Sequence, residues 1–168
     1  MSRKRTRSRP PSGWLSAEQQ RVWLAWMRVS LRLDYEIGRG LQEDSGLSLP
    51  DYHVLVALGS APDGRVQLSE LARTIGWERS RLSHHLQRMT VRGLVVRTPS
   101  TTDGRATDAV LTAAGREALD GAAPAHVEHV RRLFFGTLAD DDLPVLAELL
   151  ERVYSGVLEH GTLPPPPA

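Results

Sequence analysis

The sequence predicts a mainly α-helical protein with a small antiparallel β-hairpin, and three observations point to this fold class. Apolar residues recur at helical spacing along most of the chain. Two short helical patterns separated by a glycine occupy residues 68–91, and two short strand patterns follow at residues 94–111. A chain of 168 residues has the size of one compact domain, so these segments are expected to share one core.

The composition excludes several classes of protein. The chain has no cysteine, which excludes disulfide frameworks, thiol chemistry and cysteine-ligated zinc. Its best apolar run, residues 52–61, is about half as long as the roughly 20 residues that a membrane span needs. Prolines rather than an apolar stretch follow the basic N-terminus, which is therefore unlike a signal peptide. We expect a cytoplasmic protein with no membrane partner.

The chain is predicted to begin with a disordered basic arm at residues 1–13 and a long helix at residues 14–46. The arm is rich in arginine, proline and serine and has no apolar period. Ser16 and Gln19 match a capping box at the start of the helix, and Gly46 matches its end. Two apolar stripes run along the helix: Val22, Trp26, Val29, Leu33, Ile37 and Leu41, and beside them Trp23, Met27, Leu31 and Tyr35. A helix with two apolar faces needs two partners, so we expect an N-terminal dimerisation helix.

Residues 47–112 are predicted to form a winged helix-turn-helix. Ser48 caps a short helix with Pro50 in its first turn, and residues 61–64 form a turn. A hairpin at the end of the region is the wing, with a strand, a loop and a return strand at residues 94–98, 99–105 and 106–111.

The helix-turn-helix itself lies in residues 68–91. One face of its first helix is formed by Leu68, Leu71, Ala72 and Ile75. Gly76 breaks this helix, and a second helix begins near Glu78 with a buried stripe of Leu82, Leu86 and Met89. The spacing of Ala72, Gly76 and Leu82 is typical of a helix-turn-helix, which needs a small residue where the helices cross and a glycine in the turn.

The domain order ends with C-terminal dimerisation helices and a Pro-rich tail, at residues 113–160 and 161–168. Thr112 caps a helix that runs to about Phe135, and Pro124 is expected to kink or interrupt it. Three aspartates at residues 140–142 start a final helix, where the dipole favours them. The apolar residues of that helix are Leu143, Val145, Leu146, Leu149, Leu150, Val153, Val157 and Leu158. A small monomer cannot bury this much apolar surface, so a homodimer is expected.

The net charge of +1 conceals an uneven distribution. Residues 65–105 contain eight arginines and three acidic residues, a net charge of +5, whereas residues 14–64 and 112–168 carry −3 and −5. This asymmetry favours a polyanionic partner for the middle segment. A GC-rich genome explains the preference for arginine over lysine, but it does not explain the clustering of the arginines.

The polar face of the second helix of the motif is the main candidate surface for binding double-stranded DNA. After Glu78 this face has no carboxylate and is rich in hydrogen-bond donors. A merely solvated face normally mixes acidic and basic residues, so the pattern favours contacts to bases and phosphates. The candidate DNA contacts on it are Ser80, Arg81, Ser83, His84, Gln87 and Arg88.

The wing offers a second candidate DNA contact. Arg105, at the hairpin tip, suits a narrow and electronegative minor groove. Asp103 is expected to hold the Arg105 guanidinium through a bidentate pair. Alone, Asp-Gly-Arg indicates only a turn, and its place directly after a helix-turn-helix is what favours a DNA contact.

Taken together, these residues resemble the MarR family of bacterial transcriptional regulators. The resemblance rests on Leu68-Ser69-Glu70-Leu71-Ala72, Gly76, Ser80, Ser83, Arg88, Gly93-Leu94-Val95, Arg97, Asp103, Arg105, Leu111-Thr112, Gly115, and Leu47-Ser48-Leu49-Pro50 with Leu55. It implies an obligate homodimer with interlocked terminal helices and two winged-helix lobes on one palindromic site. It also implies a small anionic, often phenolic, effector that binds between the dimerisation helices and the winged-helix lobe and releases the DNA.

The sequence departs from the family pattern in the DNA-facing residues. His84 stands where many members carry arginine, and Gly104 and Ala106 flank Arg105 where a second arginine is common. The family's DNA sequence preference therefore does not transfer to this chain. The absence of cysteine removes the thiol-oxidation response of some members.

Four residues are candidate effector contacts: Trp23, Trp26, Arg28 and His53. The indoles can stack on an aromatic ring, and Arg28 can pair with a carboxylate. Packing in the core or at a dimer interface is the alternative role for the two tryptophans. A surface pair with a neighbouring acid explains Arg28 equally well.

Alternative functions stay open at this point. His126 and His129 lie three residues apart on one helix and can share a metal, although no cysteine or third acidic ligand accompanies them. His84 and His85 would gain charge below about pH 6.5, the unperturbed value, and strengthen non-specific DNA binding. A winged helix can also act as a protein-interaction module. No enzyme motif or phosphate-binding glycine loop is present, so we expect a non-enzymatic DNA-binding repressor without a cofactor.

Overall fold

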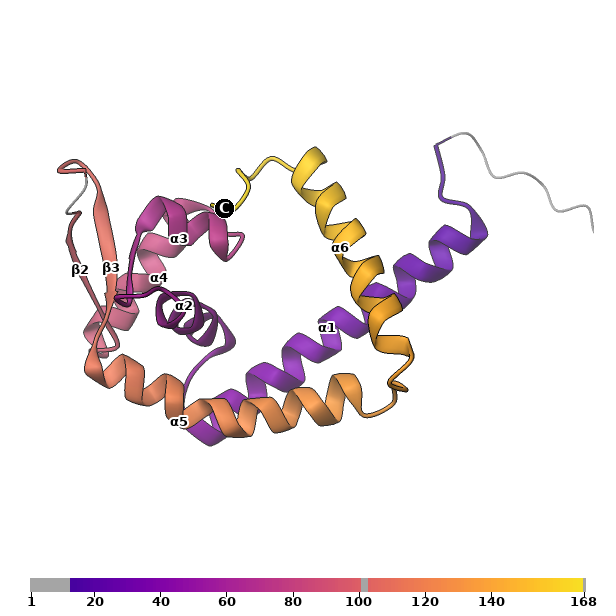
Figure 1. The fold of residues 1–168 in the computed structure, drawn as a ribbon, viewed down its shortest axis with the longest axis horizontal. Coiled ribbons are helices and arrows are strands. Elements are labelled where there is room, and N and C mark those ends of the chain that lie inside the picture. Colours follow the sequence, from indigo (N-terminus) through magenta and orange to yellow (C-terminus); the bar gives the residue numbers. More distant parts are fainter. Residues whose placement is uncertain (1–12, 101–102, 168) are drawn as a thin grey trace, which may run out of the picture. The chain divides into compact units, whose positions relative to one another are not determined.

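The computed structural model describes residues 13–100 and 103–167, so all but the last residue of the predicted basic arm lies outside the described residues. Its elements are, in order, α1 (Ala17–Ser45), α2 (Leu49–Gly59), β1 (Arg65–Gln67), α3 (Leu68–Thr74), α4 (Arg79–Val91), β2 (Val95–Pro99), β3 (Thr107–Leu111), α5 (Ala113–Val130), the π-helical turn η1 (Arg131–Phe135) and α6 (Asp142–His160) (Figure 1). This mainly helical architecture with a small antiparallel sheet confirms the predicted fold class. None of the helices in the described part combines the length and apolar character needed to cross a membrane.

The chain divides into two compact units after Glu36, and α1 runs from the first into the second. In the first unit, the Ser16 N–H donates to Oε1 of Gln19 at 2.8 Å, and the Gln19 N–H donates to Oγ of Ser16 at 3.1 Å. This reciprocal pair confirms the predicted capping box. Gly46 follows α1 with a φ of 68°, a left-handed conformation that confirms the predicted helix end.

The two parts of α1 differ in burial. The part of α1 in the second unit contributes Ile37 and Leu41 to the core, and these side chains are 6% and 2% exposed. In the first unit most of its large apolar side chains are exposed: Val22, Trp23, Leu24, Trp26, Val29, Leu31 and Tyr35. The apolar surplus predicted for this helix is therefore present on the single chain.

The core of the second unit lies among α2, α3, α4, α5 and the sheet. Its largest fully buried side chains are Leu47, Val54, Leu55, Leu58, Leu71, Leu82, Leu86, Met89 and Val95. The predicted stripe of the second motif helix, Leu82, Leu86 and Met89, is wholly inside it. Gly76 lies between α3 and α4 with a φ of 68°, and the Trp77 N–H donates to the Ala72 carbonyl at 2.8 Å. The predicted helix-turn-helix is confirmed.

The sheet has three antiparallel strands in the order β1-β3-β2. The predicted hairpin pairs Val95 with Leu111 and Pro99 with Thr107. The third strand, β1, was not predicted, and it pairs Arg65 with Val110 on the other edge of β3. Three residues are too few to show the alternation by which strands are recognised in a sequence.

The C-terminal helices differ from the prediction at Pro124. Oγ1 of Thr112 accepts from the Gly115 N–H at 2.9 Å, which confirms the cap of α5. The expected interruption at Pro124 is wrong, because α5 continues through it to Val130. Proline removes one backbone donor, and the turns on both sides keep theirs. The irregular turn comes later, at η1, and α6 has no buried residue on the single chain.

Candidate nucleic-acid interface

The structure brings the predicted DNA-facing residues together on α4. Ser80, Arg81, His84, Gln87 and Arg88 are exposed, and Ser83 is half-buried. These six side chains share one helix, whose opposite face is anchored in the core by the apolar stripe. A rigid, polar and acid-free helix face of this kind can present donors to base edges and phosphates.

His85 differs from its neighbour His84, with which the sequence grouped it. Its exposed fraction is 7%, and its ring packs edge-on against Trp77 with 5.4 Å between ring centroids. His85 occupies the helical position between Leu82 and Leu86, so it falls on the buried stripe. Helical spacing was therefore the signal that separates the two histidines, and His85 is not a DNA-facing side chain.

Asp51 is the functional residue that sequence reasoning missed. It lies in the first turn of α2, is 3% exposed, and completes a capping box with Ser48. The Ser48 N–H donates to Oδ2 of Asp51 at 2.9 Å, and the Asp51 N–H donates to Oγ of Ser48 at 3.2 Å. An acid three residues after a serine cap was the available signal.

The Asp51 carboxylate also joins α2 to α4. Nη1 of Arg92 donates to its Oδ2 at 2.6 Å, and Nε2 of His85 lies 3.0 Å from its Oδ1. Arg92 donates in addition to the Gly46 carbonyl at 3.0 Å. Burial alone would raise the pKa of Asp51, but the contacts with His85, Ser48 and Arg92 outweigh it and hold the pKa well below its usual value. Asp51 is therefore an anion that fixes α4 on α2.

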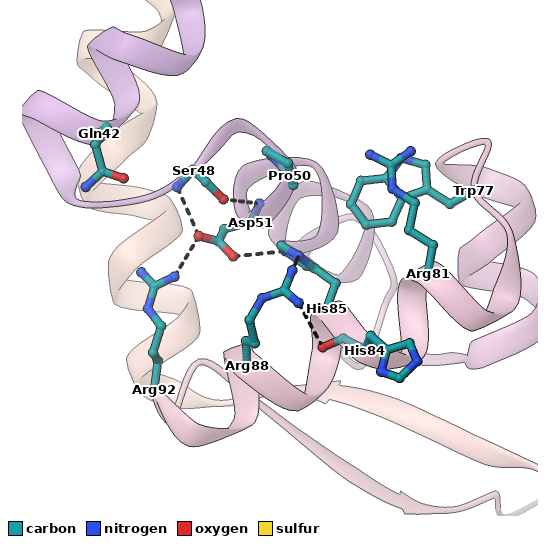
Figure 2. Close-up of a pocket in the computed structure, with 10 residues that line it drawn as sticks. All are labelled: Gln42, Ser48, Pro50, Asp51, Trp77, Arg81, His84, His85, Arg88 and Arg92. Atoms are coloured by element: carbon teal, nitrogen blue, oxygen red, sulfur yellow. Dashed lines mark hydrogen bonds and ion pairs between the residues drawn. The ribbon is translucent and has the colours of Figure 1, made fainter.

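A hollow of about 470 Å³ opens beside this carboxylate. Figure 2 shows the side chains that line it. Its lining comes from the end of α1, the start of α2, the turn before α4, and one side and the end of α4: Gln42, Ser48, Pro50, Asp51, Trp77, Arg81, His84, His85, Arg88 and Arg92. The Arg81 guanidinium lies over the Trp77 ring, 4.2 Å from its centroid. This cation–π contact holds Arg81 near the exposed face of α4.

The wing carries both of its predicted contact residues in exposed positions. The Arg105 backbone N–H donates to Oδ1 of Asp103 at 3.0 Å, so this carboxylate shapes the turn. The expected bidentate pair with the Arg105 guanidinium does not occur among the described contacts. Near the loop end of the paired strands, Nη1 of Arg65 donates to Oγ1 of Thr98 at 2.9 Å and to Oδ2 of Asp108 at 3.2 Å, which links all three strands.

Comparison with known proteins identifies this arrangement. A sequence model of the MarR family matches residues 45–106. The crystal structure of Sco3205, a MarR family transcriptional regulator from Streptomyces coelicolor in complex with DNA, is 36% identical with a TM-score of 0.84. The match covers 90% of this chain and 99% of Sco3205. The chain belongs to the MarR family.

Two further structures place this MarR-family chain among its relatives. AbsC, a MarR family regulator from Streptomyces coelicolor, is 35% identical with a TM-score of 0.81, over 86% of this chain and 97% of AbsC. The organohalide-sensing regulator RdhR-CbdbA1625, in its 2,4-dichlorophenol-bound form, is 17% identical with a TM-score of 0.77, over 91% of this chain and 89% of that one. The latter shows the shared fold. No curated protein matches the chain.

The predicted effector residues of this MarR-family chain fall in different units. Trp23 and Trp26 lie on α1 in the first unit, about half exposed at 53% and 48%. Nε of Arg28 donates to the Leu24 carbonyl at 3.3 Å, and no acidic partner of Arg28 is found in the described residues. Arg28 lines a shallow hollow on α1 with Leu31, Arg32 and Tyr35. His53 is exposed on α2, in the second unit.

The histidines of α5 have separate surroundings. The His126 ring lies 4.3 Å from the Tyr52 ring, and its Nδ1 is buried without a hydrogen-bond partner. Burial, followed by the nearby His129 and His53, lowers the pKa of His126. Nδ1 of His129 is 3.9 Å from Oδ2 of Asp44. Within the described ranges, no three histidine or acidic side chains are grouped to hold a metal ion.

Proposed function

We propose that this MarR-family chain is a homodimeric, sequence-specific DNA-binding repressor that a small, aromatic anionic effector releases from a palindromic operator. The observation that carries the proposal is the exposed face of α4, which has no carboxylate and stands on a buried helix-turn-helix. Its residues supply the donors that read bases and neutralise phosphates: Ser80, Arg81, Ser83, His84, Gln87 and Arg88. The DNA complex of Sco3205, at 36% identity, supports the same role here.

The dimer is proposed from unpartnered apolar surface. Besides the first part of α1, α6 leaves large apolar side chains in solvent on the single chain: Val145, Leu149, Leu150, Val153, Tyr154 and Val157. Contiguous exposed apolar surface of this kind marks an interaction site in a soluble protein. In a symmetric dimer, the two copies of α4 would enter successive major grooves about one helical turn apart.

The effector is proposed on chemistry. Arg28 is a cation without an acidic partner in the described part of α1, and Trp23 and Trp26 offer exposed aromatic faces on the same helix. A guanidinium can pair with a carboxylate and an indole can stack on an aromatic ring, so these residue types suit an aromatic acid. The dichlorophenol complex of RdhR-CbdbA1625, which shares the fold, is consistent with such a ligand class.

Salt-dependent DNA binding tests the proposed function. Full-length protein is titrated onto a 30-base-pair duplex (about three turns), selected from a random pool by the wild-type protein, at several salt concentrations. Arg88→Ala and Arg105→Ala should each weaken binding and reduce the slope of log affinity against log salt by about 1. Arg131→Ala, an exposed arginine on η1 that pairs with Glu128, is the charge-matched control.

Two results would contradict the proposal. If neither arginine variant changed the slope, α4 and the wing would not contact phosphate. If the wild-type protein selected no duplex and showed no salt-dependent retention on DNA, the winged helix would serve protein contacts instead.

A further inference from the structure

A buried histidine lies directly behind the DNA-facing side of α4. Nη2 of Arg88 is 2.8 Å from Nδ1 of His85, and Nη1 of Arg88 is 3.5 Å from the His84 carbonyl oxygen (Figure 2). The Arg88 guanidinium is therefore drawn back along α4 although the side chain is exposed. The His85 ring is itself fixed between Trp77 and Asp51.

The donor and acceptor roles in this contact follow from the chemistry of arginine. A guanidinium only donates hydrogen bonds, so Nδ1 of His85 must be the acceptor and must carry a lone pair. The ring is then neutral with its proton on Nε2. That nitrogen faces Oδ1 of Asp51 at 3.0 Å, although the N–H does not point straight at the oxygen.

Asp51 is itself held in a fixed position, so it can fix the orientation of the His85 ring. Its carboxylate is held by Ser48 in the first turn of α2 and by Arg92 at the end of α4. A continuous set of contacts thus runs from Asp51 through His85 to Arg88, from the buried start of α2 to the surface of α4. An unrestrained arginine would lose its rotamer freedom only on binding, whereas Arg88 has already lost part of it.

We infer that His85, oriented by Asp51, is a positioning residue that sets the Arg88 guanidinium for its contact with DNA. The inference rests on the proposed function, in which Arg88 binds DNA. His85 itself touches no DNA, because it is buried beneath Arg88. Together, Asp51 and His85 offer Arg88 one hydrogen-bond acceptor, Nδ1 of His85, in one orientation.

Two amide replacements of His85 separate its two nitrogens. The Asn amide oxygen takes the place of Nδ1, so His85→Asn keeps an acceptor for Arg88. The Gln amide nitrogen takes the place of Nε2, so His85→Gln keeps the partner of Asp51 and loses the acceptor. We expect His85→Gln to lower affinity for the selected duplex roughly tenfold, and His85→Asn to retain most of it. Thermal unfolding of each variant reports any change in stability separately.

A double-mutant cycle with Arg88→Ala distinguishes positioning from a structural role. If His85 acts through Arg88, His85→Gln should cause no further loss of affinity in the Arg88→Ala protein. Effects that multiply instead would overturn the inference, and so would tighter binding by His85→Gln, which would mean that His85 holds Arg88 away from DNA. Normal binding by Arg88→Ala would also overturn it while leaving DNA binding intact. Failure of the wild-type protein to bind any duplex would overturn the proposed function as well.

Discussion

Asp51 occupies a position that acidic side chains rarely occupy, with 3% of its surface exposed and its charge retained. Asp51→Asn keeps the shape of the side chain and removes the charge that Arg92 and His85 contact. We expect it to lower the free energy of unfolding at pH 7 by about 1.5–3 kcal/mol, the range for hydrogen bonds to a charged group. Urea denaturation of both proteins measures the difference.

The pH dependence of this difference has a definite sign. The pKa of Asp51 lies below its ordinary value of 3.8 in the folded protein, so the unfolded chain takes up the proton first as pH falls. The stabilisation is fully present above that value and is lost as the pH falls through the folded-state pKa. The difference in free energy of unfolding between the wild-type protein and Asp51→Asn should therefore become smaller below about pH 4. Asp120→Asn, an exposed change on α5, is the control, and a gap that is constant with pH would contradict the assignment.

Single residues also show where sequence reasoning succeeds and where it stops. Ser80, His84 and Arg88 could be placed on an exposed face because helical spacing fixes direction. The partner of His85 could not be predicted, since Asp51 lies on another helix and only tertiary packing brings the two together. The Asp103 carboxylate was predicted to pair with the Arg105 guanidinium. It accepts a hydrogen bond from the Arg105 backbone N–H instead, because the turn places that donor closer.

Among the elements, the junction of the wing with α5 depends on a glycine. A Cβ on Gly115 would collide with the backbone carbonyl of Leu94 and lie 2.8 Å from Cδ1 of Leu111. Backbone cannot move aside as a flexible side chain can, so Gly115→Ala should lower the free energy of unfolding by about 1–3 kcal/mol. Gly121→Ala is the matched control on the same helix.

The control should move stability in the other direction. A Cβ on Gly121 would have nothing within 4 Å, and the residue is exposed in the interior of α5. Alanine there should raise the free energy of unfolding by about 0.5–1 kcal/mol, because the unfolded chain loses freedom. Equal effects at Gly115 and Gly121 in denaturant titrations would show that the close approach to Leu94 is relieved without cost.

Elements with their own local signals were predictable, and elements without them were not. Helix starts could be predicted at Ser16, Ser48 and Thr112, because each offers a side-chain oxygen to an unpaired backbone N–H. β1 has no such signal, since it exists only by pairing with β3, far along the chain. Pro124 carried a strong signal for a break that a single missing hydrogen bond does not enforce.

At the scale of the whole molecule, the exposed apolar side of α6 predicts self-association. Val153 is 66% exposed on the single chain and belongs to the predicted stripe of α6. Val153→Arg should convert a dimer to a monomer in sedimentation experiments, because a charge would be buried without a partner. The affinity of the Val153→Arg protein for a duplex with two half-sites should fall, since the winged-helix lobes of two subunits would no longer bind it together.

A change of charge alone serves as the control for this prediction. Glu148→Gln also adds one positive unit to α6, and it leaves the apolar stripe intact. We expect it to sediment as the wild-type protein does. If Val153→Arg kept the wild-type assembly state, α6 would not form the dimer interface.

The pairing of β1 with β3 has a consequence for how the DNA-binding region loses its structure. The chain between Gln67 and Thr107 contains α3, α4 and β2, so the two strands close a loop around the helix-turn-helix. Closing such a loop is entropically unfavourable, and this loss is offset only when the enclosed helices pack. Fraying of α4 alone would leave the closed loop without that packing. The pairing of β1 with β3 thus makes the helix-turn-helix and the sheet one cooperative unit, which unfolds as a whole rather than from one end.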